Sequence, residues 1–466
     1  MLFASPTFLL VFLPLCLAAY FASPSINLKN GVLVGASLLF YAWGEPVFVL
    51  LMAAMTLVNY AAALAIDARD GKARKAALIV AVGVDLAALG LFKYAGFVAQ
   101  TLTAALAPLQ VDIPDPQIPL PLGISFFTFH CVSYLMDTYR RRFPANRSLA
   151  QVTLYIALFP QLIAGPIVRY KSIARRLVKR RHTLGRASTG IRIFIIGLAQ
   201  KVLIADSLAP LAEAVFDKAS RPGLAEAWLG TIAYALQIYF DFAGYSTMAI
   251  GLGVIFGFSL PRNFRTPYAS ASITEFWRRW HISLSTWFRD YLYIPLGGNR
   301  GPAWKTWRNL IVVFLLCGLW HGASWTFVLW GLWHGAFLVI ERAGLGPVLA
   351  RAPRVIGWTY ALAVVLFGWV LFRAPDMAGA ADIWSGMVGL NGLGGLAITT
   401  GQALQPVHEW LIPLACVLAV ARWPRRFHGP GDWRKWLDTA LVLGLLALAL
   451  LRVASGTYSP FLYFRF

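Results

Sequence analysis

One histidine of this sequence lies in an apolar segment, where an ionisable side chain indicates a catalytic or binding role. His321 belongs to the stretch LWHGASW (Leu319 to Trp325), between the apolar runs Ile311 to Leu316 and Trp325 to Trp333. An ionisable group in an apolar membrane segment costs free energy, so it marks a functional site by default. An imidazole titrates at about pH 6.5 and can accept the proton of an attacking hydroxyl group. A buried histidine that only hydrogen-bonds a neighbouring helix is the structural alternative.

A second polar group, Gln237, Tyr239, Asp241 and Tyr245, lies in the otherwise apolar segment 226–257. Asp241 is the most costly member, because a carboxylate at the centre of a span costs about 2.5 to 3.5 kcal/mol on insertion scales. We therefore expect Asp241 to face the protein interior, either with a partner or protonated. A structural polar contact is favoured over catalysis, since one carboxylate without a neighbouring base does not form an acid and base pair.

The elements that must position these residues are membrane helices. The chain has 466 residues, of which 59% are hydrophobic and 13% are charged, and its mean hydropathy is +0.64. Its apolar runs approach the length of a spanning helix and lack the alternation of a β-barrel strand. We predict an all-α, multi-pass protein with about 11 to 12 spans plus re-entrant and interfacial helices. Residues 1–466 are expected to form one integral membrane domain.

The net charge of +21 is confined to short segments between the apolar runs. This distribution indicates cytoplasmic loops and contact with anionic lipid, and argues against a nucleic-acid partner. Part of the charge is also suited to an anionic substrate. The basic clusters are Lys72 to Lys75, Arg140 to Arg147, Arg169 to Arg192, Arg262 to Arg308, Arg351 to Arg354 and Arg422 to Lys435.

The positive-inside rule places Lys29 in the cytoplasm and the N-terminus outside. Residues 31–66 then form two spans that turn at Gly44 to Pro46. The apolar segment 149–168 has basic residues on both sides, so we expect a re-entrant hairpin broken within Phe159 to Pro166; a plain span is the alternative. The other expected spans are an N-terminal one, 76–98, 119–137, 189–205, 226–257, two within 309–341, 355–372, 408–421 and 437–453.

Residues 262–308 contain no span and are expected on the cytoplasmic face. Ser272 and Glu275 match the capping box of a helix start. The helix that follows places its apolar residues on one side and three arginines on the other, so it should lie along the membrane interface. His281 is expected within this helix. The apolar residues are Ile273, Phe276, Trp277, Trp280, Leu284, Trp287 and Phe288, and the arginines are Arg278, Arg279 and Arg289.

The arginines of this segment are suited to phosphate oxygens, and lipid headgroups are an equal alternative. Residues 309–341 favour two closely packed spans or a broken hairpin, because Gly318, Gly322, Gly331 and Gly335 allow helices to approach closely. On one continuous helix, His321 and His334 would be about 20 Å apart along the axis. With no HExxH or Cys/His ligand set, we expect no metal site. The four cysteines are expected to be small core residues.

Several long motifs together resemble the membrane-bound O-acyltransferase family, in particular its bacterial alginate O-acetylation branch. The motifs occur in the family's order and cover nearly the whole chain. They are PLGISFFTFH (Pro121 to His130), FPQLIAGPIVRY (Phe159 to Tyr170), QIYFDFAGYSTMAIG (Gln237 to Gly251), FWRRWHISLSTWFRDYLYIPLGG (Phe276 to Gly298), HGASWTFVLWGLWHG (His321 to Gly335) and the terminal FLYFRF.

The resemblance implies a helical ring around a tunnel, in which an acyl group passes from a cytoplasmic thioester, acetyl-CoA, to an acceptor on the opposite face. It implies no resident cofactor, a bacterial inner-membrane location, and a polysaccharide or a periplasmic acetyltransferase as partner. His321 aligns with the family's invariant histidine and His281 with its second signature position. We expect His321 to be the general base, with His281 assisting, and His334 to be a packing residue. Candidate substrate-binding residues are Arg278, Arg279, Asp241, Tyr245, Trp280 and Ser324.

Two alternatives remain at this point. One is transfer of D-alanine from a carrier protein, or of acetyl to peptidoglycan, by the same fold. The other is a transporter or polysaccharide-export component, which inverted repeats would favour.

The terminal motif of the family usually has Gln where this chain has Arg465, so the tail's contact with partners is in doubt.

Overall fold

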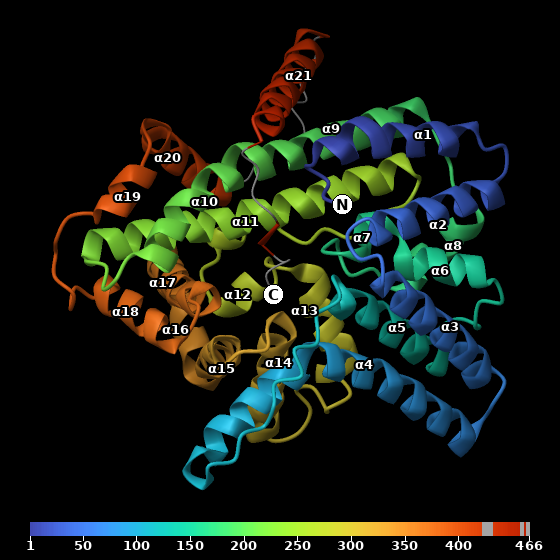
Figure 1. Ribbon diagram of the computed structural model, residues 1–466, viewed down its shortest axis with the longest axis horizontal. Helices are drawn as coiled ribbons and strands as arrows, with labels where there is room; N and C mark the ends of the chain where they lie inside the picture. The colour runs from blue at the N-terminus through green and yellow to red at the C-terminus, as the bar shows by residue number, and fades with distance from the viewer. Residues whose placement is uncertain (422–431, 457–460, 463–466) are drawn as a thin grey trace. The chain divides into compact units, whose positions relative to one another are not determined.

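The computed structural model describes residues 1–421, 432–456 and 461–462, and all regular elements among them are helical (Figure 1). The prediction of an all-α protein is confirmed. Contacts divide the chain into two compact units. Unit 1 comprises Met1–Phe194 and Met248–Pro261, and unit 2 comprises Ile195–Thr247 and Arg262–Phe466. That residues 1–466 act as one domain stays a prediction.

The helices that begin in unit 1 are α1 (Leu13–Ala22), α2 (Ile26–Ala42), α3 (Phe48–Asp67), α4 (Gly71–Leu106), α5 (Ile124–Tyr139), α6 (Leu149–Ala157), α7 (Phe159–Leu162), α8 (Tyr170–Val178) and α9 (Leu184–Ala199). Those that begin in unit 2 are α10 (Asp206–Glu213), α11 (Leu224–Ile255), α12 (Ile273–Trp277), α13 (Ile282–Phe288), α14 (Ala303–His321), α15 (Trp325–Ile340), α16 (Gly346–Arg351), α17 (Arg354–Arg373), α18 (Met377–Met387), α19 (Ile398–Ala403), α20 (Pro406–Val420) and α21 (Asp432–Ala454).

Short π-helical turns interrupt or extend these helices at Phe8–Phe12, Gln200–Ala205, Ala214–Lys218, Arg289–Tyr293 and Glu341–Leu345, and 3-10 turns occur at Ala107–Leu109 and Pro267–Ala269.

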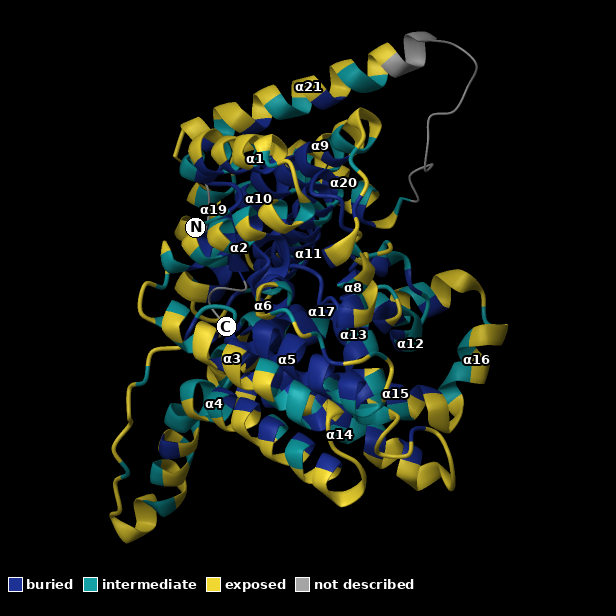
Figure 2. Ribbon diagram, turned by 90° about the vertical axis from the view of Figure 1, so that its right-hand side faces the viewer, coloured by how far each residue is buried: buried dark blue, intermediate teal, exposed yellow. Residues whose placement is uncertain are grey.

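Within the described residues, six helices are long and apolar enough to cross a membrane, and three shorter apolar helices accompany them. The chain is therefore a multi-pass membrane protein. The number is below the predicted 11 to 12 because several predicted spans form helices shorter than these six, among them α2, α5, α15 and α20. Figure 2 shows α11 buried along most of its length, whereas α21 is largely exposed.

The predicted breaks in unit 1 are present. The turn at Gly44 to Pro46 separates α2 from α3, and the segment 149–168 breaks after α6 into the single turn α7 and a buried non-helical stretch. A Cβ atom on Gly165 would lie 2.4 Å from the carbonyl oxygen of Pro160, so the chain folds tightly back there. The broken backbone is confirmed; re-entry from one side of the membrane stays a prediction.

In unit 2, α14 and α15 form the predicted pair of closely packed helices (Figure 1). A Cβ atom on Gly318 would lie 2.2 Å from the Phe327 carbonyl oxygen, and one on Gly331 would lie 2.2 Å from that of Phe314. The two backbones are therefore in contact at these glycines, as small-residue packing in membranes requires.

The expectation that all cysteines are core residues is wrong for one of them. Cys16, Cys131 and Cys317 are buried, but Cys416 in α20 is exposed. An apolar environment in the sequence of a membrane protein does not distinguish the protein core from the lipid-facing surface, because both are apolar.

Candidate active site

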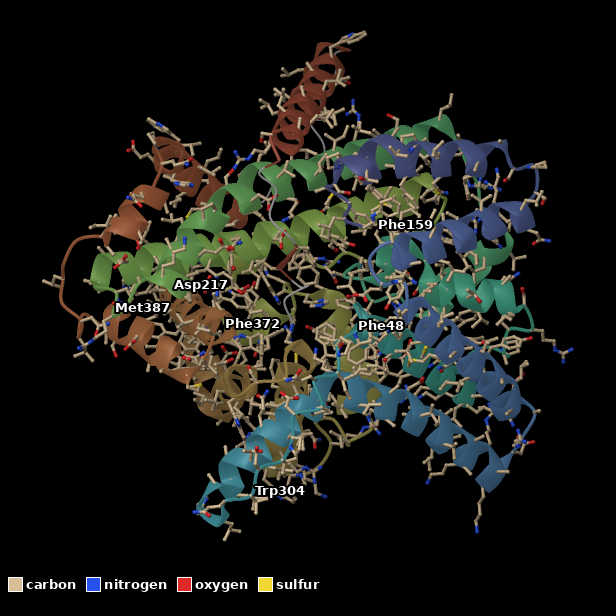
Figure 3. All side chains as sticks on the ribbon, viewed as in Figure 1. Phe48, Phe159, Asp217, Trp304, Phe372 and Met387 are labelled. Atoms are coloured by element: carbon tan, nitrogen blue, oxygen red, sulfur yellow. The ribbon has the colours of Figure 1, made fainter. Side chains whose placement is uncertain are left out.

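His321 is the last residue of α14, and its side chain is only 3% exposed. Gly322 follows with extended backbone, so the helix ends at the histidine. Aromatic rings surround the imidazole: the ring centroids of Trp330 and Phe372 lie 5.0 Å and 5.1 Å away. Phe372 comes from α17 and is labelled in Figure 3. The histidine at the end of α14 is therefore packed against aromatic rings of α15 and α17.

The expected helix through His281 is wrong, because it is interrupted at this residue. α12 ends at Trp277, α13 begins at Ile282, and His281 between them has a left-handed backbone with φ 40° and ψ 55°. Non-glycine residues rarely adopt this conformation, and such strain occurs often at functional sites. The break turns His281 inward, where it is fully buried, instead of leaving it on an interfacial helix.

Two residues far along the chain explain why the helix breaks. Asn263 caps α13, since its backbone and side-chain oxygens accept hydrogen bonds from the amides of Ile282 (2.9 Å) and Ser283 (3.2 Å). Glu341 caps α12 by accepting from the amides of Ile273 (2.5 Å) and Thr274 (2.9 Å). The free amides at the start of each short helix thus find acceptors on residues outside that helix. The local sequence of the helices does not reveal these acceptors.

At the start of α12 the predicted cap is present in modified form. The Ser272 side chain accepts from the Glu275 amide at 3.0 Å, as predicted. The Glu275 carboxylate accepts from the amide of Ala271 at 2.7 Å, one residue before the position that a capping box uses.

The break brings His281 next to His321, with their ring centroids 6.5 Å apart. Trp320 lies beside both imidazoles, at 6.0 Å from His281 and 4.8 Å from His321. His281 also meets the Phe242 ring edge to face, with the ring centroids 4.6 Å apart. Burial lowers the pKa of His281 to about 3, so this imidazole is neutral at physiological pH.

Asp241 has the interior position and the partner that its sequence context predicts. Its Oδ1 lies 2.9 Å from Nζ of Lys201, which also contacts Oδ1 of Asp206 at 2.5 Å. All three side chains are buried. Gly244 makes the contact feasible, because its missing side chain lets α11 approach the backbone of Gly197 and Lys201. The three charges form a buried ion cluster between α11 and the π-helical turn after α9.

The described part of the C-terminal tail also reaches this cluster. The Leu462 amide donates to Oδ2 of Asp241 at 2.8 Å. The Phe461 ring stacks on Tyr245 with centroids 4.5 Å apart, and it lies 6.2 Å from Phe242. A continuous set of contacts therefore runs from the tail through Phe242 to His281. Arg465 and the other tail residues of the motif lie outside the described residues, as does most of the basic cluster from Arg422.

The remaining candidates have different neighbours. Arg278 is exposed, and Arg279 forms an ion pair with Glu275 at 2.5 Å. Trp280 is buried against other aromatic rings, among them Trp369 at 4.8 Å. The Ser324 hydroxyl lies 2.8 Å from that of Thr326. Their roles in binding substrate stay predictions.

His334 lies on α15, one helix after His321, and both imidazoles contact the ring of Trp330, at 5.1 Å and 5.0 Å. The break at Gly322 thus brings the two histidines closer than a continuous helix would. His334 is fully buried and stacks on Phe276 at 6.2 Å. These ring contacts agree with a packing role, which stays a prediction.

Sequence reasoning missed Lys201 and Asp206. Lys201 lies in the apolar segment 189–205, so the rule that selected Asp241, an ionisable residue inside a span, applies to it equally. Phe242 and Phe372 gave no such signal, since buried phenylalanines occur throughout the chain.

Comparisons with known proteins agree with the resemblance. The profile of the MBOAT, membrane-bound O-acyltransferase family, matches residues 40–380. A probable alginate O-acetylase, AlgI, of Azotobacter vinelandii is 41% identical over 502 residues, covering 100% of both chains. The Pseudomonas aeruginosa protein of the same description is 47% identical, over 83% of this chain and 75% of its own. A peptidoglycan O-acetyltransferase of Helicobacter pylori is 34% identical over 100% of this chain and 98% of its own.

Proposed function

Because the chain belongs to the membrane-bound O-acyltransferase family and is an O-acyltransferase, we propose that it moves an acetyl group from acetyl-CoA to hydroxyl groups of an exported polysaccharide such as alginate. The donor binds from the cytoplasm and the acceptor is reached on the opposite face, directly or through a periplasmic partner. The enzyme acts in the bacterial inner membrane. The alginate O-acetylases among the relatives support this acceptor class.

The buried position of His321, 6.5 Å from His281, carries the proposal. In the first step, a ring nitrogen of His321 accepts the proton of the acceptor hydroxyl while its oxygen attacks the thioester carbonyl carbon. The tetrahedral intermediate then collapses, the carbon–sulfur bond breaks, and the leaving thiolate takes the proton from the imidazolium. His321 is thereby returned to its neutral form, and no other reactant is consumed.

His281 assists this step as a neutral imidazole. Its buried position next to His321 suits a group that hydrogen-bonds the thioester or the acceptor and holds it for attack. Effective positioning of reactants contributes strongly to catalysis when water is excluded. Trp320, which contacts both histidines, and Trp330 and Phe372, which contact His321, supply this exclusion.

In this proposal, Asp241 and Tyr245 belong to the substrate-binding region on the side of the C-terminal tail, where they contact Leu462 and Phe461. The ion pair of Asp241 with Lys201 supports a structural role, as the sequence favours. Arg278, which is exposed, and Arg279 contact the phosphates of the donor, and Trp280 and Ser324 complete the substrate-binding set. No resident cofactor is required by this chemistry.

The decisive experiment replaces His321 with Ala and measures acetylation of the exported polysaccharide at equal protein abundance in the membrane. We expect acetylation to be lost. His334→Gln, which changes another buried histidine on the neighbouring helix, is the matched control and should retain activity. Acetylation retained by His321→Ala would exclude the general-base role.

A second acceptor is peptidoglycan, and the full-length similarity to the Helicobacter pylori peptidoglycan O-acetyltransferase favours it. Analysis of acetyl esters on both polymers, in cells that express the wild-type chain or His321→Ala, separates the two. Esters that disappear from the polysaccharide identify the proposed acceptor, and esters that disappear from the cell wall identify the alternative.

A further inference from the structure

Unit 1 contains a group of cations around the hydroxyl group of Tyr20, near the end of α1. The hydroxyl donates to the carbonyl oxygen of Phe256 at 2.8 Å. It also lies 3.2 Å from Nε of Arg180 and 2.8 Å from Nε2 of His182. Since its one hydrogen is directed to Phe256, the hydroxyl oxygen accepts from both of these nitrogens. Tyr20 thereby holds a guanidinium and an imidazole next to each other.

Two further cations lie around this pair. Nζ of Lys29 is 5.3 Å from the centroid of the Tyr20 ring. Asn30, the next residue of α2, donates to the carbonyl oxygen of Leu177 at 2.8 Å and so holds the start of α2 against α8. Arg186 lies in the first turn of α9 and interacts electrostatically with His182, as do Lys29 and Arg180.

The positive charges of this cluster have no carboxylate counterpart in the described chain. Arg180 is 9% exposed, and its Nη2 has no hydrogen-bond partner among the described residues. Its guanidinium stacks on the Phe258 ring at 4.4 Å. A buried charge that lacks an opposite charge is costly. Further cations nearby increase that cost, and an anion would remove it.

We propose that Lys29, Arg180, His182 and Arg186 form a binding site for a phosphate group, carried by the headgroup of an anionic phospholipid or by a soluble phosphate compound. Lysine and arginine both bind phosphate oxygens by charge-assisted hydrogen bonds. Lys29, His182 and Arg186 are half-buried and accessible to a ligand. Arg180 supplies a fixed charge beneath them.

The surroundings of the site fit a ligand at the membrane surface. Phe21, Val178 and Leu184 are exposed apolar residues at the ends of α1 and α8 and the start of α9. Phe21 lies beside Lys29, whose Nζ is 5.9 Å from its ring centroid. Cations next to exposed apolar side chains match a headgroup with its acyl chains. All residues of this site belong to unit 1, whereas His281 and His321 belong to unit 2, and the proposal does not depend on acyl transfer.

The test is binding to the purified full-length protein in detergent. The probes are phosphatidylglycerol, phosphatidylcholine and inorganic phosphate, measured by native mass spectrometry and by fluorescence. The variant Lys29→Ala with Arg186→Ala removes two accessible charges. Lys72→Ala with Lys75→Ala is the matched control, because it removes the same charge from exposed positions of unit 1. Tyr20→Phe, which removes the organising hydroxyl, is a second variant.

We expect the cluster variant to bind phosphatidylglycerol about tenfold more weakly than the wild type, and the control variant to bind as the wild type does. Tyr20→Phe should also weaken binding. Binding of phosphatidylglycerol that inorganic phosphate does not displace identifies a lipid site, whereas displacement by inorganic phosphate identifies a soluble ligand. The proposal would be overturned if the cluster and control variants bound equally well. It would also be overturned if the protein did not prefer phosphatidylglycerol over phosphatidylcholine and did not bind inorganic phosphate.

Discussion

The rings of His281 and His321 lie 6.5 Å apart, although 40 residues separate them in the sequence. The left-handed backbone of His281 and the end of α14 at His321 together produce this proximity. Neither histidine lies in the interior of a helix: His281 directly precedes α13, and His321 is the last residue of α14. The pair is thus held by two helix ends, each fixed by capping or packing from elsewhere in unit 2.

The role of His281 is tested by His281→Asn. We expect kcat for acetyl transfer to fall by about 10²-fold or more, because the group that positions the reacting atoms next to His321 is shortened. KM for the donor should change less. Steady-state kinetics on purified protein at matched folded fraction measure both quantities. An unchanged kcat would remove His281 from the active site.

The capping role of Glu341 predicts that Glu341→Ala lowers both stability and activity. Loss of its carboxylate leaves the amides of Ile273 and Thr274 without acceptors, which costs about 1 to 3 kcal/mol. Thermal unfolding in detergent measures the stability. The rate of acetylation shows whether activity is lost, as we expect if His281 is no longer held next to His321. Glu409→Ala, which removes an exposed acid from the first turn of α20, serves as the control. A Glu341 variant as stable as this control would contradict the role.

The buried ion cluster predicts a large effect for Lys201→Met. Removing the lysine leaves Asp241 and Asp206 buried near each other, and breaking such a pair costs about 3 to 5 kcal/mol. Adding Asp241→Asn should recover part of the loss, since one uncompensated charge disappears. A double-mutant cycle of unfolding free energies measures this coupling. Strictly additive effects would show that the two residues do not interact.

The close packing of α14 and α15 predicts that Gly318→Ala destabilises the protein. The added methyl group would overlap the Phe327 backbone, and overpacking costs about 1 to 3 kcal/mol. Gly444→Ala in α21, where no atom lies within 4 Å of the added group, is the matched control and should be neutral or slightly stabilising. Thermal unfolding of both variants tests the difference. Equal stability would exclude backbone contact at Gly318.

The anion site predicts a pH dependence. Burial, and then the charge of Lys29, lower the pKa of His182 in the free protein, with Arg180 and Arg186 adding to the effect. A bound phosphodiester raises that pKa, so the complex takes up a proton and binding strengthens as pH falls. The affinity for phosphatidylglycerol should therefore increase as the pH falls from about 8 to about 5. His182→Gln should abolish the trend, and a trend that persists in this variant would assign it to another group.

The sequence by itself determined the class of molecule, and it predicted one candidate reactive residue. Apolar composition, segregated positive charge and unbroken hydrophobic runs require a helical membrane protein, because backbone polar groups must be satisfied within lipid. His321 was selected as a candidate for a related reason, since an ionisable group is rarely placed in an apolar segment without a function; its role as general base stays a prediction. The breaks near Gly44 and within 149–168 were predictable from local helix breakers.

Tertiary structure alone decided how the site is assembled. Local periodicity favoured one helix through His281, but Asn263 and Glu341 supply caps that are distant in the sequence and stabilise two short helices instead. The partner of Asp241 also depended on the fold, because only the close approach at Gly244 brings Lys201 to it. Pairings of this kind arise from residues on different helices, and the sequence records the members of each pair without recording their contact.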